Sequence, residues 1–266
     1  SSDGMDNKNI KFTVVTCTYN AAQVLQTTLD SVRRQTWRNV EHIIMDGRSA
    51  DSTVSVAEAY KAESDACGCG HEVIVVSEPD KGLYDAMNKS LKRATGDYVV
   101  FLNAGDAYPS SSTLEDIAAC VKPGEELPAV LYGDTDLVDI NGRFVAYRRL
   151  TPPERLTWRS FRHGMLVCHQ AFYARTDIAR SEPYNLQYRY SADVDWCIRI
   201  MKRAARERLE LRNVNKVLVN YLAEGMTTAN HRASLKERFR VMCVHYGTLS
   251  TVLMHLWFAV RALIRH

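Results

Sequence analysis

Carboxylates follow short apolar runs at several widely spaced points of the chain. Asp46, Asp80 and Asp106 each come after such a run, and Asp193 and Asp195 stand two residues apart much later. In an open parallel sheet the carboxyl ends of the strands meet at one crevice, so these side chains should converge there. Carboxylates that share a crevice repel one another unless a divalent cation or a cationic side chain lies between them. The pattern therefore predicts a site for a nucleotide and a metal ion.

Further groups beside these carboxylates suit a nucleotide. Thr18 and Tyr19 close the first apolar run, where a turn before a helix exposes backbone N–H groups to a base or a phosphate. Asp46 would accept a hydrogen bond from a ribose hydroxyl or a base N–H. We expect Asp80 to face the ribose or the base and Lys81 to lend positive charge to a diphosphate. A solvated turn is the alternative for both residues.

Asp106, with Asn103 close by, is the candidate metal ligand. Magnesium and manganese prefer oxygen ligands and often take one or two carboxylates together with substrate phosphates. One carboxylate and one amide would therefore hold an ion that arrives with the nucleotide. A type I turn before Pro109 is the alternative interpretation.

Asp193 and Asp195 lie at the start of a predicted helix. Residues at i and i+2 do not share a helix face, so the two side chains should have different roles. We expect one to act as a general base in the crevice and the other to cap the helix or pair with Arg199.

Alternating strand and helix patterns are expected to position these residues. Apolar, β-branched runs predict strands over 12–18, 40–45, 71–77 and 98–102. Helical spacing follows each of them, over 21–36, 52–63, 82–95 and 112–121. This alternation indicates a doubly wound α/β fold with a mostly parallel sheet and right-handed crossovers.

The second half of the chain has a different character. A turn at Asn141-Gly142 predicts a small antiparallel part made of strands over 129–135 and 142–149. Helices are predicted over 193–208 and throughout 233–266. We expect residues 1–9 to be a disordered leader or tag, 10–230 the α/β domain and 231–266 a helical segment.

Composition excludes some classes of protein. The 266 residues are 46% hydrophobic and 24% charged, as in ordinary globular proteins. A net charge of +3 is too small to predict nucleic acid as a partner. Seven cysteines, mostly in apolar segments, predict reduced thiols and a cytoplasmic location. Neither G-x-G-x-x-G nor G-x-x-x-x-G-K-[ST] occurs, which disfavours a dinucleotide dehydrogenase and a P-loop enzyme.

Taken in order, four segments resemble family 2 of the inverting glycosyltransferases. They read VVTCTYNAAQVLQTTLDSVRRQT, IIMDGRSADST, SEPDKGLYDAMNKSLKRATGDYVVFLNAGD and SADVDW. The resemblance implies a GT-A fold, a nucleotide-diphosphate sugar as donor and manganese or magnesium as cofactor. It places Thr18, Tyr19 and Asp46 at the nucleoside, and Asp80 and Lys81 at the base and diphosphate.

The resemblance also assigns the remaining acids. The family's metal motif is commonly D-x-D-D, and here Asn103-Ala104-Gly105-Asp106 retains only the last acid, which would bridge the ion to the diphosphate. The family's catalytic base is the aspartate of a Glu-Asp pair. Ala192 replaces that glutamate, Asp193 takes the position of the base, and Asp195 is the second candidate.

The activity implied is direct displacement of a nucleoside diphosphate, for which the family favours UDP, by an acceptor hydroxyl. A carbohydrate or lipid-linked acceptor in bacterial surface polysaccharide or glycolipid assembly would fit this activity. The alternatives are a sugar-nucleotide pyrophosphorylase and a non-catalytic nucleotide-sugar-binding or scaffold protein.

The apolar residues 249–264 are too short and too interrupted for a membrane span. Two interpretations stay open for this segment. In one, it makes peripheral contact with the inner face of the cytoplasmic membrane. In the other, it packs on the domain or in a homodimer.

Overall fold

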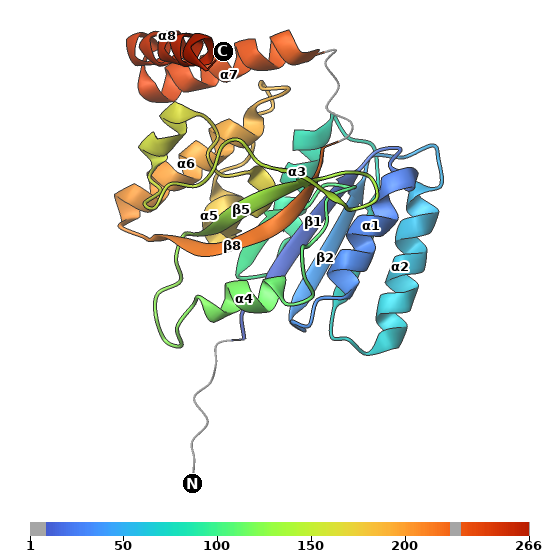
Figure 1. The fold of residues 1–266 in the computed structure, drawn as a ribbon. Helices are drawn as coiled ribbons and strands as arrows, with labels where there is room; N and C mark the ends of the chain where they lie inside the picture. Colours follow the sequence, from blue (N-terminus) through green and yellow to red (C-terminus); the bar gives the residue numbers. More distant parts are fainter. Residues whose placement is uncertain (1–8, 224–229, 266) are drawn as a thin grey trace.

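A single mixed sheet runs through the computed structural model, which describes residues 9–223 and 230–265. Within those residues the sheet has eight strands in the order β3-β2-β1-β4-β7-β5-β6, with β8 paired to β5 (Figure 1). The first four strands in the chain are parallel where they pair. Their ends lie within one residue of the prediction: β1 Phe12–Thr18, β2 Val40–Asp46, β3 Glu72–Ser77 and β4 Tyr98–Phe101.

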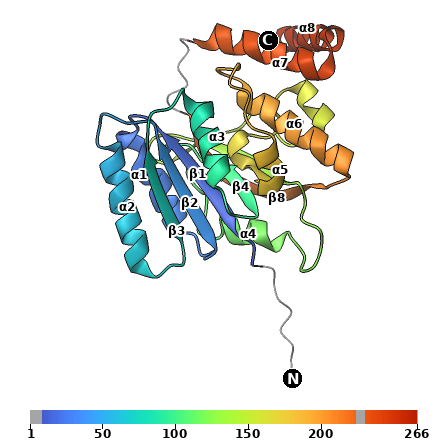
Figure 2. The same ribbon diagram turned by 180° about the vertical axis from the view of Figure 1, so that it is seen from behind.

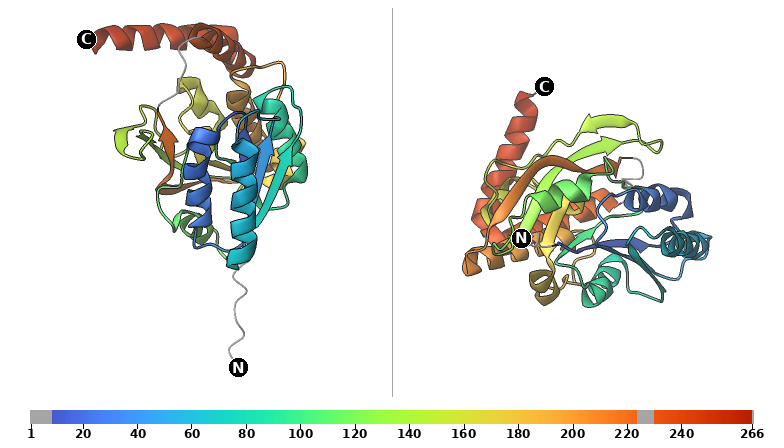
Figure 3. Two further views of the ribbon diagram at one scale, coloured as in Figure 1. Left: turned by 90° about the vertical axis from the view of Figure 1, so that its right-hand side faces the viewer. Right: turned by 90° about the horizontal axis from the view of Figure 1, so that it is seen from below.

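Helices cover both faces of the sheet, as a doubly wound fold requires. One face carries α1 Ala22–Arg33 and α2 Thr53–Cys67, and the opposite face carries α3 Leu83–Arg93 and α5 Thr176–Ser181 (Figures 2 and 3). The short helix α4 Thr113–Ala119 follows β4. The predicted fold class, an α/β fold with a mostly parallel sheet, a small antiparallel part and C-terminal helices, is confirmed.

The antiparallel part is larger than the sequence predicted. The expected hairpin is present as β5 Val130–Val138 and β6 Phe144–Tyr147, with Gly142 in the turn at φ +77°. Two unpredicted strands join it: β7 Phe172–Arg175, antiparallel to β4 and β5, and β8 Leu211–Leu222, parallel to β5. Through β7 the hairpin becomes an extension of the parallel sheet.

Helix α6 Ala192–Glu207 is held at the end of β4 by aromatic packing. Trp196 is fully buried, with its ring centroid 6.0 Å from that of Phe101 and 4.8 Å from that of Tyr184. Buried aromatic side chains contribute much of the apolar area removed from water in a core. This packing fixes the first turn of α6 near the carboxyl ends of the parallel strands.

The C-terminal segment is helical, as expected, but it is divided into two helices. Gly247, at φ +86°, separates α7 His231–Tyr246 from α8 Thr248–Ile264. The pair lies at the end of the molecule where the parallel strands finish (Figure 1). None of the helices in the described residues has the length and apolarity needed to cross a bilayer. Residues 1–8 of the expected leader and residue 266 lie outside the described residues.

Candidate functional site

The turns after β1, β2 and β3, called here the strand-end turns, meet at Asp46. Thr18 donates a hydrogen bond to Asp46 Oδ1 and Ser77 donates one to Oδ2, each at 2.8 Å. Ser49 adds its backbone N–H and its hydroxyl. Burial opposes ionisation of this 1% exposed side chain, but the hydrogen bonds hold the pKa of Asp46 below its usual value. Asp46 therefore organises the turns, and its contact with a ribose or base stays a prediction.

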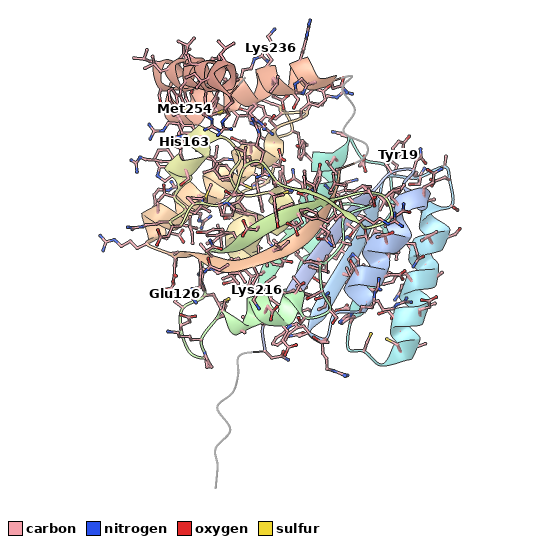
Figure 4. The ribbon with its side chains drawn as sticks, in the orientation of Figure 1. Tyr19, Glu126, His163, Lys216, Lys236 and Met254 are labelled. Carbon is pink, nitrogen blue, oxygen red and sulfur yellow. The ribbon has the colours of Figure 1, made fainter. Side chains whose placement is uncertain are left out.

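Tyr19 projects from this end of the sheet, with 70% of its surface exposed (Figure 4). The next residue, Asn20, has φ +49° and links the first two strand-end turns. Its backbone N–H donates to Ser49 Oγ at 2.8 Å, and its side-chain oxygen accepts from the Ala50 N–H at 2.8 Å. A fixed turn thus presents an exposed aromatic ring, which is suited to stacking on a base.

The third strand-end turn packs directly on the second. A Cβ added at Gly47 would lie 2.5 Å from Asp80 Oδ2, so a larger residue at position 47 would require the Asp80 carboxylate to move. Asp80 Oδ1 accepts a hydrogen bond from the Gly82 N–H at 2.9 Å. Lys81 is exposed beside it. The structure thus brings Asp80 against Gly47, the residue after Asp46, and leaves the Lys81 side chain in solvent.

Asp106 lies deeper, at the end of β4. Its side chain is 3% exposed, and Oδ1 accepts a hydrogen bond from the Leu222 N–H of β8 at 2.9 Å. Gly105 has φ +101°, and a Cβ there would come within 2.6 Å of Leu222. The positive φ, together with this contact, disfavours an acidic side chain at position 105, which is one of the positions where the chain departs from the family's metal motif.

The donor groups near Asp106 fit a metal ion that brings its other ligands with it. In residues 9–223 and 230–265, no three acidic, histidine or cysteine side chains converge to bind a metal. Among the described residues, however, Asp106 Oδ2 is buried without a hydrogen-bond partner, and burial raises the pKa of Asp106 to about 7. A cation at Oδ2 would stabilise the ionised form. Asn103 lines the adjoining pocket and could add an amide oxygen.

That pocket, called here the lateral pocket, has a volume of about 410 Å³. It lies between the N-terminal half of α3, the start of α6 and α7, and it includes the ends of β5 and β8. Its polar lining includes Tyr84, Asn103, Arg148, Arg149, His169, Asp193 and Arg238. Apolar side chains complete the wall, as is usual for small-molecule sites.

Asp193 enters the lateral pocket from the first turn of α6. The Tyr84 hydroxyl donates to Asp193 Oδ1 at 3.2 Å, and the Val194 N–H donates to the same oxygen at 2.9 Å. Tyr84 OH also lies 3.1 Å from the Tyr190 carbonyl oxygen, which is an alternative acceptor for its single proton. Both hydrogen bonds to the carboxylate involve Oδ1, which leaves Oδ2 to receive a proton.

Asp195 faces the opposite way. Its Oδ2 pairs with Arg199 Nε at 2.8 Å, and its Oδ1 lies 2.7 Å from His245 Nε2 of α7. Burial opposes ionisation of this 4% exposed side chain, but His245 and Arg199 hold the pKa of Asp195 below its usual value. Asp195 thus pairs with Arg199, and the role of Asp193 as the general base stays a prediction.

His169 also lines the lateral pocket. It is buried, its ring stacks on Phe101 with centroids 5.3 Å apart, and its Nε2 lies 2.7 Å from the Tyr184 hydroxyl. Burial lowers the pKa of His169, so the ring is neutral at physiological pH. These contacts make His169 part of the rigid floor of the pocket.

Helix α7 supplies residues that the sequence gave no reason to expect. Glu237 accepts hydrogen bonds from the backbone N–H groups of Arg189, Tyr190 and Ser191, at 3.0, 2.7 and 2.7 Å. These groups immediately precede α6 and are therefore close to Asp193. Only a carboxylate close in sequence to the start of α6 could have indicated this role. Glu237 lies 46 residues after Ser191, so the sequence gave no such indication.

An open, mostly parallel sheet with acidic strand-end turns and a neighbouring pocket defines a glycosyltransferase of the GT-A class. The chain belongs to glycosyl transferase family 2, whose family model matches residues 13–181. A PGL/p-HBAD biosynthesis glycosyltransferase of Mycobacterium tuberculosis is 35% identical over 212 residues, which cover 79% of this chain and 76% of the relative. The amylovoran biosynthesis glycosyltransferase AmsB of Erwinia amylovora is 28% identical over 203 residues, covering 73% of this chain and 65% of AmsB.

Solved structures share the fold at low sequence identity. S. aureus TarS 1-349 in complex with UDP-GlcNAc has a TM-score of 0.66 at 18% identity, covering 87% of this chain and 65% of that one. The mannosyltransferase PcManGT of Pyrobaculum calidifontis, in complex with GDP-Man and Mn²⁺, has a TM-score of 0.58 at 18% identity, covering 92% and 66%. The present chain thus spans slightly less than two thirds of the TarS chain.

Proposed function

We propose that this glycosyltransferase transfers a sugar from a UDP-sugar to an acceptor hydroxyl with inversion at the anomeric carbon, in the assembly of a surface glycan. The observation that carries the proposal is Asp193, a half-buried carboxylate in the lateral pocket next to the strand-end turns. The names of the curated relatives support the glycan, and the UDP-GlcNAc complex of TarS supports the nucleotide.

The strand-end turns would hold the nucleoside diphosphate. Tyr19 stacks on the base, and Thr18 and Asp46 lie beneath it at the edge of the sheet. Asp80 faces the ribose or base, and the exposed Lys81 reaches the diphosphate. The hydrogen bonds centred on Asp46 hold these groups in place before the donor binds, so less ordering is needed on binding.

Asp193 acts as the general base. Oδ2 accepts the proton of the acceptor hydroxyl while that oxygen attacks the anomeric carbon from the side opposite the diphosphate. The hydrogen bonds from Tyr84 and Val194 to Oδ1 fix the orientation of the carboxylate. Asp106 Oδ2 and Asn103 would hold a manganese or magnesium ion, whose chemistry is to offset the charge that grows on the departing diphosphate.

The first test is calorimetry with UDP and GDP, with and without manganese, on the parent protein and on Asp106→Ala. Manganese-dependent binding of UDP that is lost in Asp106→Ala is expected. Asp116→Ala is the matched control, because Asp116 lies on α4 and outside the strand-end turns. If the parent protein binds neither nucleotide, the proposed function is wrong.

Helix α8 would place the enzyme on a membrane. Between residues 230 and 265, Glu237 is the only acidic residue beside six cationic ones: Arg232, Lys236, Arg238, Arg240, Arg261 and Arg265. Large apolar side chains of α8 are exposed, among them Leu249, Leu253, Leu256, Trp257, Val260 and Leu263. An apolar helix face beside basic residues is the pattern of a helix that lies in the interface of an anionic bilayer.

Sedimentation with vesicles tests this contact. Binding to phosphatidylglycerol vesicles and weak binding to phosphatidylcholine vesicles are expected, and Leu253→Glu/Trp257→Glu should reduce binding at least tenfold. Lys61→Glu on α2 is the matched control for an added charge far from α8. A parent protein that ignores vesicles and forms a dimer, which the double substitution dissociates, would instead show that α8 covers a second copy.

A further inference from the structure

Three arginines form one wall of the lateral pocket. Arg148 and Arg149 directly follow β6, and Arg238 comes from α7, 89 positions further along the chain. Burial, followed by the neighbouring Arg238 and Arg149, lowers the pKa of Arg148. Two segments that are distant in sequence therefore bring like charges together, which is unfavourable unless an anion is present between them.

The hydrogen-bonding capacity of these arginines is largely unused within the described residues. The Arg148 guanidinium donates one hydrogen bond, from Nη1 to the Leu150 carbonyl oxygen at 2.9 Å, and Arg149 is exposed. Arg238 Nε is buried without a partner. A guanidinium carries five N–H donors, and buried donors without partners are costly. Asp193 is the only acidic side chain that lines the pocket, and no ion pair joins it to these arginines in residues 9–223 and 230–265.

The lateral pocket adjoins the expected place of the donor at Asn103, a candidate metal ligand, but it excludes the residues expected to hold the nucleoside. The lining of the lateral pocket contains no residue before Leu83, so Tyr19, Asp46, Asp80 and Lys81 all lie outside it. In a displacement with inversion, the attacking hydroxyl and the departing diphosphate lie on opposite sides of the anomeric carbon. Groups that share a pocket with the base therefore meet the acceptor.

The rest of the pocket wall is apolar. Leu83, Met87, Leu150 and Met165 line it together with the arginines. Guanidinium groups match the geometry of phosphate oxygens and bind them in a bidentate manner. The wall thus suits a molecule that carries a phosphate beside an apolar part.

We propose that Arg148, Arg149 and Arg238 bind a phosphate group carried by the acceptor, so that the acceptor is an anionic amphiphile. The proposal rests on the proposed function, because it takes Asp193 as the base. A phosphate could also come from the donor, and the experiment distinguishes the two sources.

Calorimetry with farnesyl phosphate, and with farnesol as its uncharged counterpart, tests the proposal on protein already saturated with UDP and manganese. We expect farnesyl phosphate to bind at least tenfold more tightly than farnesol. Arg149→Gln should lower the affinity for farnesyl phosphate roughly tenfold, and Arg149→Gln/Arg238→Gln should lower it further. Each substitution removes charge-assisted hydrogen bonds to the phosphate. UDP affinity should be unchanged in both variants, which also shows that they are folded.

Arg240→Gln is the matched control, because Arg240 is an exposed arginine of α7 outside the pocket lining. Equal binding of farnesol and farnesyl phosphate would overturn the proposal. So would competition with UDP, in which farnesyl phosphate binds the nucleotide-free protein but not the UDP-saturated protein, together with weakened UDP binding in the variants. The arginines would then hold the diphosphate of the donor. If UDP itself does not bind the parent protein, it is the proposed function that fails.

Discussion

The strand-end turns are made from consecutive strand–turn–helix units, whereas the lateral pocket is assembled from segments that lie far apart in the chain. The turns use residues between Thr18 and Gly82, and each follows its own strand. The pocket combines α3, the β5–β6 hairpin, α6, β8 and α7. A substitution in one strand-end turn should therefore affect mainly that turn. The lateral pocket, in contrast, can be altered by substitutions in segments that are far apart in the sequence.

The difference also concerns charge. The strand-end turns contain hydrogen-bonded carboxylates, Asp46 and Asp80, with Lys81 exposed beside them. The lateral pocket contains one carboxylate, Asp193, and three arginines. The two regions thus differ in charge, because carboxylates predominate in the strand-end turns and arginines in the lateral pocket.

Replacement of the candidate general base should have the largest effect. It should abolish the function of the lateral pocket and leave nucleotide binding at the strand-end turns unchanged. Asp193→Asn is expected to lower turnover by about 10²- to 10⁴-fold, the contribution typical of a general base. UDP affinity, measured by calorimetry, should stay unchanged because the strand-end turns are intact. Asp177→Asn, in the first turn of α5, is the control. Substantial turnover in Asp193→Asn would show that the base lies elsewhere.

Asp195→Asn should weaken the fold around the lateral pocket. The change leaves Arg199 and His245 without their buried partner, and we expect the free energy of unfolding in urea at pH 7 to fall by about 3 kcal/mol. The folded-state pKa of Asp195 lies below its usual 3.8, so the stabilisation is present above that value and is lost as pH falls through the lowered pKa. Parent and variant should therefore converge in stability below about pH 4, and a constant difference down to pH 2 would contradict this account.

Glu237→Gln tests whether α7 positions the base. The variant loses the charge that strengthens three hydrogen bonds to the segment before α6, and we expect kcat to fall roughly tenfold with little change in the KM for the donor. Lys236→Gln changes an exposed residue of the same helix and should have no effect (Figure 4). An equal loss in UDP affinity would indicate general unfolding instead of misplacement of Asp193.

Tyr19→Ala should have the smallest effect and should concern only the strand-end turns. Loss of stacking on the base is expected to weaken UDP roughly fivefold, or about 1 kcal/mol. Tyr19→Phe, which keeps the ring, is the control and should bind UDP like the parent protein. Because Tyr19 is exposed, the melting temperature should not change. If Tyr19→Ala binds UDP as tightly as the parent protein, the uracil base lies elsewhere along the edge of the sheet.

The strand-end turns could be predicted from the sequence because each strand there is a continuous apolar run that ends at its own polar turn. β8 could not be predicted in this way. Asn215 has φ +59°, and two register shifts against β5 interrupt the alternation of side chains that marks a strand. Without β8, neither the hydrogen bond from Leu222 to Asp106 nor the crowding at Gly105 could be foreseen.

The arginine wall and Glu237 were hidden for a related reason. Arg148 and Arg149 look like ordinary hairpin residues, and Arg238 and Glu237 look like the polar face of a tail helix. Their roles depend on where α7 packs, and a single sequence carries no record of that contact. Different roles for Asp193 and Asp195 could be predicted, because two side chains at i and i+2 of one helix point in different directions.

The hydrogen bond between Asp106 and Leu222 makes the position of Asp106 depend on a strand that is synthesised much later than Asp106 itself. The Leu222 N–H contacts Asp106 Oδ1 across 116 positions, and Ala107 exchanges two backbone hydrogen bonds with Asn220 beside it. A nascent chain that ends before β8 already contains every residue of the strand-end turns, but it lacks the strand that fixes Asp106. Such a chain lacks the contact that fixes Asp106, so under the proposed function it could not yet hold the metal ion and the nucleotide sugar at this position.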